Sequence, residues 1–229
     1  MVSRYYRSIN CLLIGLLFIN IMLTIRATPY NSFHIKASSD IELATAFLRF
    51  QEHYESPNDK FRGQIFTLGQ YKKWYSTQKG AFTYYSDWRG FNIPSKTLIP
   101  FLEGLFDPLT ALEESLIDLF RYSSVDQNFY IIGANDDETL NHELNHALYA
   151  YSPTYKTSID ELFDSQLEHI KYAMQHLLQK GYCRYMLYDE LQSYILDQDS
   201  EIVDLIADNT IASKVHSVFE KFGENHYEN

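Results

Sequence analysis

The sequence predicts a mainly α-helical chain with a small β-sheet, an α+β fold, and three observations support this. Apolar residues recur at helical spacing in several segments, most clearly between 159 and 177. Helix-start patterns, in which a capping side chain precedes a glutamate by three positions, occur at Ser39, Asn135 and Ser158. One segment, 129–133, combines aromatic and β-branched residues as strands do. With 229 residues, 45% of them hydrophobic, the chain can bury the core of one compact domain.

The first 27 residues are typical of an export signal. Arg4 and Arg7 precede an apolar stretch over 11–25, and polar residues follow it. About 15 apolar residues are few for a membrane-spanning helix, which needs roughly 20. We therefore expect a signal peptide over 1–27, an exported protein (secreted or periplasmic) and a single domain over 28–229. The alternative is a membrane anchor formed by residues 11–25, which would be the chain's only membrane contact.

Charge and cysteine content restrict the function further. Asp and Glu number 30 against 19 Lys and Arg, a formal net charge of -11. Such a balance produces no general attraction to phosphate backbones or anionic bilayers, so we expect neither nucleic-acid binding nor peripheral membrane binding. Removal of the signal would leave Cys183 as a lone thiol, which excludes an internal disulfide. The sequence makes no prediction of an oligomeric state.

The first half of the domain is predicted as two helices separated by an irregular region. The first helix follows the Ser39 cap and runs through Tyr54. Residues 61–100 are rich in aromatic residues and glycines without a regular period, so short strands and helices are expected there. Packing in the core is the first explanation of these aromatic residues, and a carbohydrate- or peptide-binding groove is the alternative. Apolar residues at helical spacing predict the second helix over 108–122.

The second half is predicted as one strand, 129–133, followed by four helices. The first helix begins at the Asn135 cap and ends near Tyr151. The second covers 158–180 and is terminated by Gly181. The remaining two are expected over 184–196 and 200–222.

A His-Glu-x-x-His motif lies within the helix expected after the strand. His142 and His146 are four residues apart and therefore share one helix face, so both imidazoles can face a common point. Glu143 stands one step round the helix, where it can reach a water on a metal bound there. The apolar residues of this helix lie on a different face, which places the histidines at the edge of a cleft. The motif predicts one Zn²⁺ per chain.

A catalytic zinc has three protein ligands and one open position, so a third ligand is needed. The metzincin continuation is absent, because Tyr149 stands where it requires glycine and Ser152 where it requires a ligand. The chemically suitable residues downstream are Asp160, Glu161, Asp164, Glu168, His169, His176, Asp189 and Glu190. Glu190 stands apart from most of them because it lies on a separate predicted helix.

Together the two segments resemble the gluzincin metallopeptidases, the thermolysin-like group, in which a second helix supplies a glutamate ligand within Asn-Glu-x-x-Ser-Asp. The sequence matches this pattern at Glu190 and Ser193, but Asp189 stands where the pattern has Asn and Tyr194 where it has Asp. The resemblance implies a zincin-like metallopeptidase domain in which the metal-binding helix follows an edge strand. That strand would be 129–133, and an extended peptide would add along it as a further strand.

The resemblance also implies a ligand set and a mechanism. Zn²⁺ would be bound by His142, His146 and Glu190, and Glu143 would act as the general base in peptide-bond hydrolysis. A carboxylate that orients a histidine ligand is expected, with Asp197, Asp160 and Asp164 as candidates. Candidates for the oxyanion donor are Tyr149, Tyr151, Tyr155, His169, Tyr185 and Tyr194.

We therefore expect an exported zinc peptidase that acts on a peptide or protein substrate. Two alternatives come from other functional classes. One is a noncatalytic exported protein that keeps a zincin-like scaffold or only a metal site. The other is a membrane-tethered helical interaction protein in which the motif is coincidental.

Overall fold

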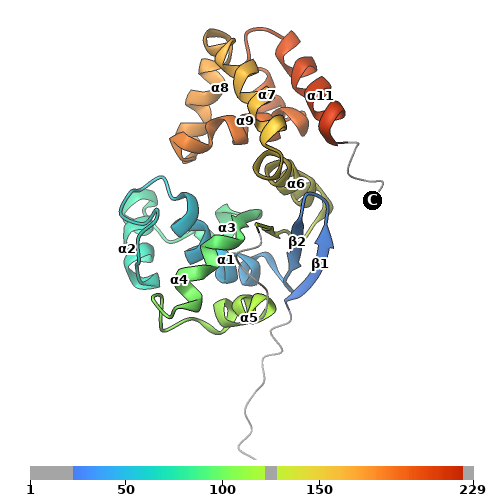
Figure 1. The fold of residues 1–229 in the computed structure, drawn as a ribbon. Coiled ribbons are helices and arrows are strands. Elements are labelled where there is room, and N and C mark those ends of the chain that lie inside the picture. Colours follow the sequence, from blue (N-terminus) through green and yellow to red (C-terminus); the bar gives the residue numbers. More distant parts are fainter. Residues whose placement is uncertain (1–22, 122–127, 224–229) are drawn as a thin grey trace, which may run out of the picture.

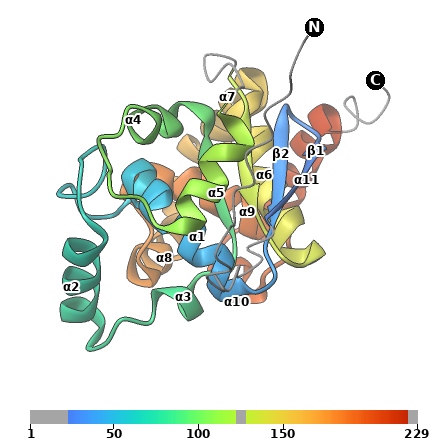
Figure 2. The same ribbon diagram turned by 90° about the horizontal axis from the view of Figure 1, so that it is seen from below.

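The structure is a computed structural model that describes residues 23–121 and 128–223. A small sheet lies between two groups of helices, with α1 to α5 on one side and α7 to α11 on the other (Figure 1, Figure 2). The described chain is therefore mainly helical with a small sheet, which confirms the predicted α+β class.

The sheet has four strands in the order β1-β2-β4-β3. The hairpin strands β1 (Thr24–Thr28) and β2 (Ser32–Lys36) are antiparallel. The predicted strand is present as β4 (Tyr130–Gly133), which pairs in parallel with β2 and antiparallel with β3 (Phe91–Pro94). The prediction that this strand lies at a sheet edge is wrong, because both of its sides are hydrogen-bonded to neighbouring strands.

Successive side chains of β4 enter two different hydrophobic cores, as expected for a strand buried on both faces. Ile131 belongs to the core formed with α1 (Asp40–Glu55). Ile132 belongs to the core formed with α6 (Asp137–Tyr151) and α9 (Leu187–Leu196). The sheet therefore separates the two hydrophobic cores, and residues that follow β3 or β4 lie near the boundary between these cores.

The first group of helices packs around α1, which begins at Ser39 as predicted. The residues after α1 form only short elements apart from α2, as expected for the region 61–100. These are α2 (Leu68–Lys79), α3 (Tyr84–Asp87), β3, a 3-10 turn (Ser95–Leu98) and α4 (Ile99–Leu102). Many aromatic side chains of this region are buried in the first core, which confirms core packing as their main role.

The helix predicted over 108–122 is α5 (Ala111–Phe120), and the predicted end at Tyr122 lies outside the described residues. Thr110 and Glu113 form a reciprocal capping box at its start. Glu113 also forms a buried ion pair with Arg49 of α1, 2.5 Å between Nη2 and Oε2. This pair joins α5 to the helix that lines the candidate site.

The second group begins with α6, which has the predicted extent but a different cap. The side chain of Asp136 accepts the backbone N–H of Thr139, whereas Asn135 binds outside the helix, to Asp40 and to the backbone of Ala37. The predicted capping role of Asn135 is therefore wrong.

The single helix predicted over 158–180 is two helices, α7 (Pro153–Asp164) and α8 (Leu167–Lys180). Helix α7 starts at Ser152, whose hydroxyl accepts the backbone N–H of Tyr155, so Ser158 is not a cap. The helix predicted over 184–196 is a 3-10 turn followed by α9, and the segment 200–222 contains α10 (Ser200–Val203) and α11 (Thr210–Gly223).

Most of the predicted export signal, and most of the predicted anchor 11–25, lies in residues 1–22, outside the described residues. The expected boundary after Ala27 falls within β1. Within 23–121 and 128–223, none of the helices combines the length and apolar character that crossing a membrane requires. Cys183 is a buried free thiol.

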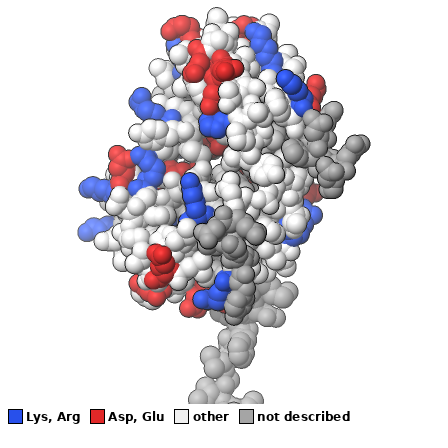
Figure 3. All heavy atoms as spheres, in the orientation of Figure 1, with Lys and Arg blue, Asp and Glu red and all other residues white. Residues whose placement is uncertain are grey.

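Charged side chains of both signs are interspersed on the face of the molecule drawn in Figure 3, with uncharged surface between them. Lysine and arginine do not gather into a continuous patch on this face.

Candidate metal centre

Two helices bring the three predicted ligands together. His142 and His146 lie one turn apart on α6, and Glu190 lies on α9, which packs beside α6. Their ligand atoms lie within 4.8 Å of one another, so the three side chains form a group that could hold a metal ion. The sequence-based choice of Glu190 as a partner of the two histidines is consistent with this arrangement.

The distances within this group match those of a metal site. The Nε2 atoms of His142 and His146 are 3.2 Å apart. Two nitrogens bound to one tetrahedral zinc at about 2.0–2.1 Å are separated by roughly 3.3–3.4 Å. Oε2 of Glu190 lies 3.8 Å from Nε2 of His146 and is buried without a hydrogen-bond partner. A divalent cation between the three side chains would supply the partner that this oxygen lacks.

The sequence of α6 explains why the histidines are presented in this way. Leu140, Ala147 and Leu148 are buried in the second core and fix the orientation of the helix. The helix starts directly after β4, and the carboxylate of its cap, Asp136, satisfies a backbone N–H of the first turn. The two histidines consequently face α9.

Each histidine is oriented by a carboxylate on its other ring nitrogen. Nδ1 of His142 donates to Asp197, 2.5 Å away, and Nδ1 of His146 donates to Asp189, 2.8 Å away. These contacts leave Nε2 of both rings as the ligand atom, the arrangement common in metal sites. Asp197 was one of three sequence-based candidates for this orienting role. Asp189 was instead a candidate metal ligand, but in the structure it contacts the proposed ligand His146.

Carboxylates surround the group, and two of its three members, His146 and Glu190, are buried. Burial lowers the pKa of His146, but the carboxylates of Asp189 and Glu190 outweigh this effect and raise that pKa well above its ordinary value. Burial raises the pKa of the Glu190 carboxyl, an effect that His146 only partly opposes. Buried carboxylates without enough positive charge around them favour the binding of a cation.

Glu143 is held beside the cluster by contacts with β3 and the turn before it. Asn92 donates from Nδ2 to Oε2 of Glu143 at 2.5 Å, and the hydroxyl of Tyr130 donates to Oδ1 of Asn92 at 2.8 Å. Gly90 approaches so closely that an added Cβ would lie 2.0 Å from Oε1 of Glu143. The carboxylate therefore has a defined position at the metal cluster.

The other candidate ligands belong to other contacts. Within the described ranges, the group of His142, His146 and Glu190 is the only one with metal-ligating geometry. Asp160 accepts hydrogen bonds from Tyr149 and Lys156, and Asp164 accepts one from Tyr188. Glu168 pairs with Lys171, His169 contacts Gln166, and His176 pairs with Glu201.

Of the tyrosines predicted as oxyanion donors, Tyr194 lies nearest the cluster, with its ring centroid 5.0 Å from that of His142. Its hydroxyl is 2.7 Å from that of Tyr182, which lines the same pocket as Glu143. Tyr155 instead donates to Gln192, and Tyr185 is 80% exposed. Tyr182 was not predicted, because its place beside the cluster depends on the turn after α8.

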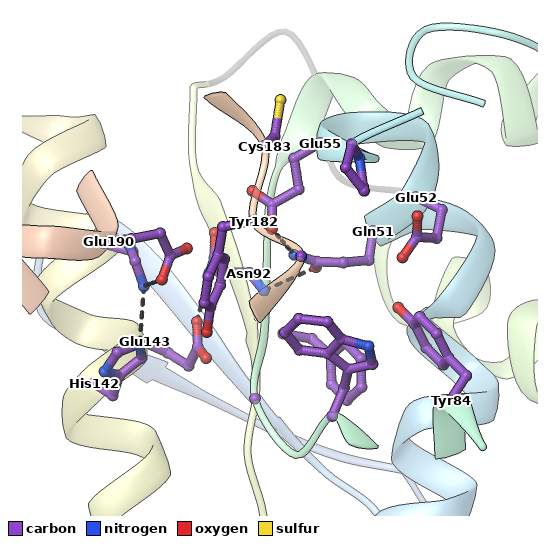
Figure 4. A pocket seen from close by; sticks show the side chains of 16 residues that line it. Gln51, Glu52, Glu55, Tyr84, Asn92, His142, Glu143, Tyr182, Cys183 and Glu190 are labelled. Atoms are coloured by element: carbon purple, nitrogen blue, oxygen red, sulfur yellow. Dashed lines mark hydrogen bonds and ion pairs between the residues drawn. The ribbon is translucent and has the colours of Figure 1, made fainter. Parts of the chain in front are cut away.

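A pocket extends from the metal cluster towards α1. Figure 4 shows Glu143 and Glu190 on one side of it and Glu52 on the opposite side, with Glu55 between them. Burial raises the pKa of Glu52 to about 7 and that of Glu55 to about 8. Neither residue can be selected from the sequence, because nothing in the pattern of the first helix distinguishes them from other helical glutamates.

Comparison with known proteins adds no information about the site. No protein-family model, no curated protein and no solved structure matches the sequence or the fold.

Proposed function

We propose that the protein is an exported zinc-dependent metallopeptidase of gluzincin-like organisation. The observation that carries this proposal is the convergence of three unlinked features. The two Nε2 atoms are 3.2 Å apart, a buried carboxylate oxygen of Glu190 lacks a partner, and Glu143 is fixed at the same pocket. A helix with surface histidines requires none of these features, and a hydrolytic metal site requires all of them.

The chemistry follows from the positions of the chain's own groups. Zinc, when bound, supplies a Lewis acid that polarises a carbonyl group and lowers the pKa of a water. Glu143 accepts the proton of the attacking water and delivers it to the leaving amine. Asn92 keeps the Glu143 carboxylate in position for both transfers. The hydroxyls of Tyr182 and Tyr194, which lie beside the cluster, are the proposed donors for the developing oxyanion.

The shape of the surface supports a chain-like substrate. The pocket towards α1 and a second, more open hollow share His142, Glu143 and Tyr182. The second hollow continues to Lys79, at the end of α2, and to Asp199, after α9. A peptide bound across both would place one of its bonds at Glu143.

Strand addition is not how this peptide would be held. Strand β4 is internal, and the backbone N–H of Asn92 in β3 is already bound by the side chain of Gln51, 3.1 Å away. Side chains that line the hollows must therefore provide most of the substrate contacts.

The test is hydrolysis of a mixed peptide library by the zinc-loaded protein, followed by mass spectrometry. We expect cleavage that a chelator abolishes and that zinc restores. Glu143→Gln should keep the zinc and lose at least a thousandfold in kcat, whereas Glu161→Gln, an exposed glutamate of α7, should retain full activity. Zinc binding without any cleavage would support a noncatalytic metal-binding protein instead.

A further inference from the structure

Two glutamates of α1 have unsatisfied oxygens in the pocket beside the metal cluster. Oε2 of Glu52 and Oε2 of Glu55 are both buried and have no hydrogen-bond partner. Glu52 is only 7% exposed. A buried polar group without a partner destabilises the folded chain, and a charged one does so more strongly. Groups of this kind are typical of sites in which a ligand supplies the missing partner.

Neighbouring side chains contact both carboxylates. Gln51 donates from Nε2 to Oε1 of Glu55 at 2.5 Å, and its own Oε1 accepts the backbone N–H of Asn92. The hydroxyls of Ser56, Tyr71 and Tyr84 interact with the Glu52 carboxyl and lower its pKa, although less than burial raises it. Both carboxylates are therefore fixed by neighbours, and each has one oxygen left for a ligand.

The surroundings of these oxygens indicate the chemistry of the ligand. Tyr84, Trp88 and Phe91 line the same pocket, and none of its lining residues in the described chain is a lysine or arginine. Neither Glu52 nor Glu55 belongs to a group with metal-ligating geometry. Carboxylates next to aromatic rings bind organic cations, through charged hydrogen bonds and through the ring faces.

We propose that Glu52 and Glu55 form a subsite that binds a positively charged group of the substrate, an ammonium or a guanidinium. The inference rests on the proposed function in one respect, namely that the cation is carried by a peptide. Two sources share this chemistry: the side chain of a lysine or arginine near the scissile bond, and a free amino terminus.

The acidity of the two glutamates is consistent with this role. Burial holds the pKa of both carboxyls at about 7 to 8, so they ionise reluctantly without a partner. A cation in the pocket stabilises the ionised form and lowers both pKa values.

Calorimetric binding of small probes to the zinc-loaded protein tests the subsite without hydrolysis. Acetyl-arginine amide against acetyl-citrulline amide tests a side-chain cation, and alanine amide against acetyl-alanine amide tests an amino terminus. We expect the cationic member of at least one pair to bind at least tenfold more tightly. Glu52→Gln and Glu55→Gln, made singly, should each reduce this preference at least fivefold.

The control is Glu114→Gln, which removes the same charge from an exposed position on α5 and should leave the preference unchanged. Zinc content and thermal unfolding establish that each variant is folded and retains the cluster. Equal binding of the charged and neutral members of both pairs would overturn the inference. So would a preference that persists when both glutamates are replaced.

Peptide hydrolysis separates this inference from the proposed function. A protein that binds a cationic probe through Glu52 and Glu55 but cleaves no peptide has the subsite without the proposed activity. A protein has the activity without the subsite if it cleaves arginine and citrulline peptides at equal kcat/KM and also cleaves peptides with free and acetylated amino termini at equal kcat/KM.

Discussion

Nδ1 of His142 donates a hydrogen bond to Asp197, which lies at the end of α9, 55 residues further along the chain. His146 has the equivalent contact with Asp189, on the first turn of α9. One helix therefore orients both imidazoles and also supplies Glu190. This relationship makes the packing of α6 against α9 the structural basis of the candidate metal centre.

Removal of either orienting carboxylate should weaken metal binding. We expect Asp197→Asn and Asp189→Asn each to reduce zinc affinity about 10- to 100-fold, because the rings lose the contact that fixes their orientation. Competition with a chromogenic chelator measures this. Asp164→Asn, which alters only a contact with Tyr188, should bind zinc as the unmodified protein does. Unchanged affinity in both test variants would mean that the carboxylates do not act on the metal site.

Gly90→Ala should displace Glu143 without unfolding the chain. The added Cβ would lie 2.0 Å from Oε1 of Glu143, the far end of a side chain that can move. We expect kcat for peptide cleavage to fall at least tenfold while zinc content stays the same. Gly69→Ala is the matched control, because its nearest neighbouring atom is 4.0 Å away. Full activity of Gly90→Ala would show that the position of Glu143 is not critical.

Stability should depend on pH through Glu52. The pKa of this carboxyl is raised by burial from 4.5 to about 7 in the folded chain, so the folded state binds more protons than the unfolded state between these values. The Glu52 contribution to the free energy of unfolding therefore falls as pH rises from about 4.5 to about 7, by on the order of 3 kcal/mol, and then levels off.

Urea unfolding of the unmodified protein and of Glu52→Gln across this pH range measures the effect. The variant should gain stability relative to the unmodified protein as pH rises, because it has no charge to bury. A stability difference that stays constant from pH 4 to pH 8 would contradict the buried, unpaired state of Glu52.

The buried ion pair between Arg49 and Glu113 should be essential to the stability of the helices that pack around α1. Arg49→Met leaves Glu113 buried without its partner and should cost about 3–5 kcal/mol in the free energy of unfolding. Adding Glu113→Gln should recover much of this loss, because glutamine is neutral and retains a capping side chain for α5. Denaturant midpoints of the single and double variants measure both effects. A double variant no more stable than Arg49→Met would show that the charge of Glu113 is not the cause.

The ligand set could be predicted from sequence because each part of it is local. His142 and His146 are related by one helical turn, and Glu190 lies in a short motif on a second helix. Glu55, Asn92 and Gly90 could not be predicted, because they reach the site only when β3 packs against both α1 and α6. No spacing in the sequence encodes that contact.

The errors in the fold also have local causes. The apolar stripe from 159 to 177 continues across the break between α7 and α8, but Leu167, which belongs to it, is 48% exposed. Strand β3 ends in Pro94, a residue that rarely signals a strand. The segment that forms β1 was assigned to an export signal, so its pairing with β2 was not predicted.

The proposed zinc site is tested most directly by a crystal structure of the zinc-soaked protein, with anomalous data collected at the zinc absorption edge. We predict one strong anomalous peak about 2.0–2.2 Å from Nε2 of His142, Nε2 of His146 and a carboxylate oxygen of Glu190. A peak bound by other residues, or no peak in crystals soaked at saturating zinc, would contradict it.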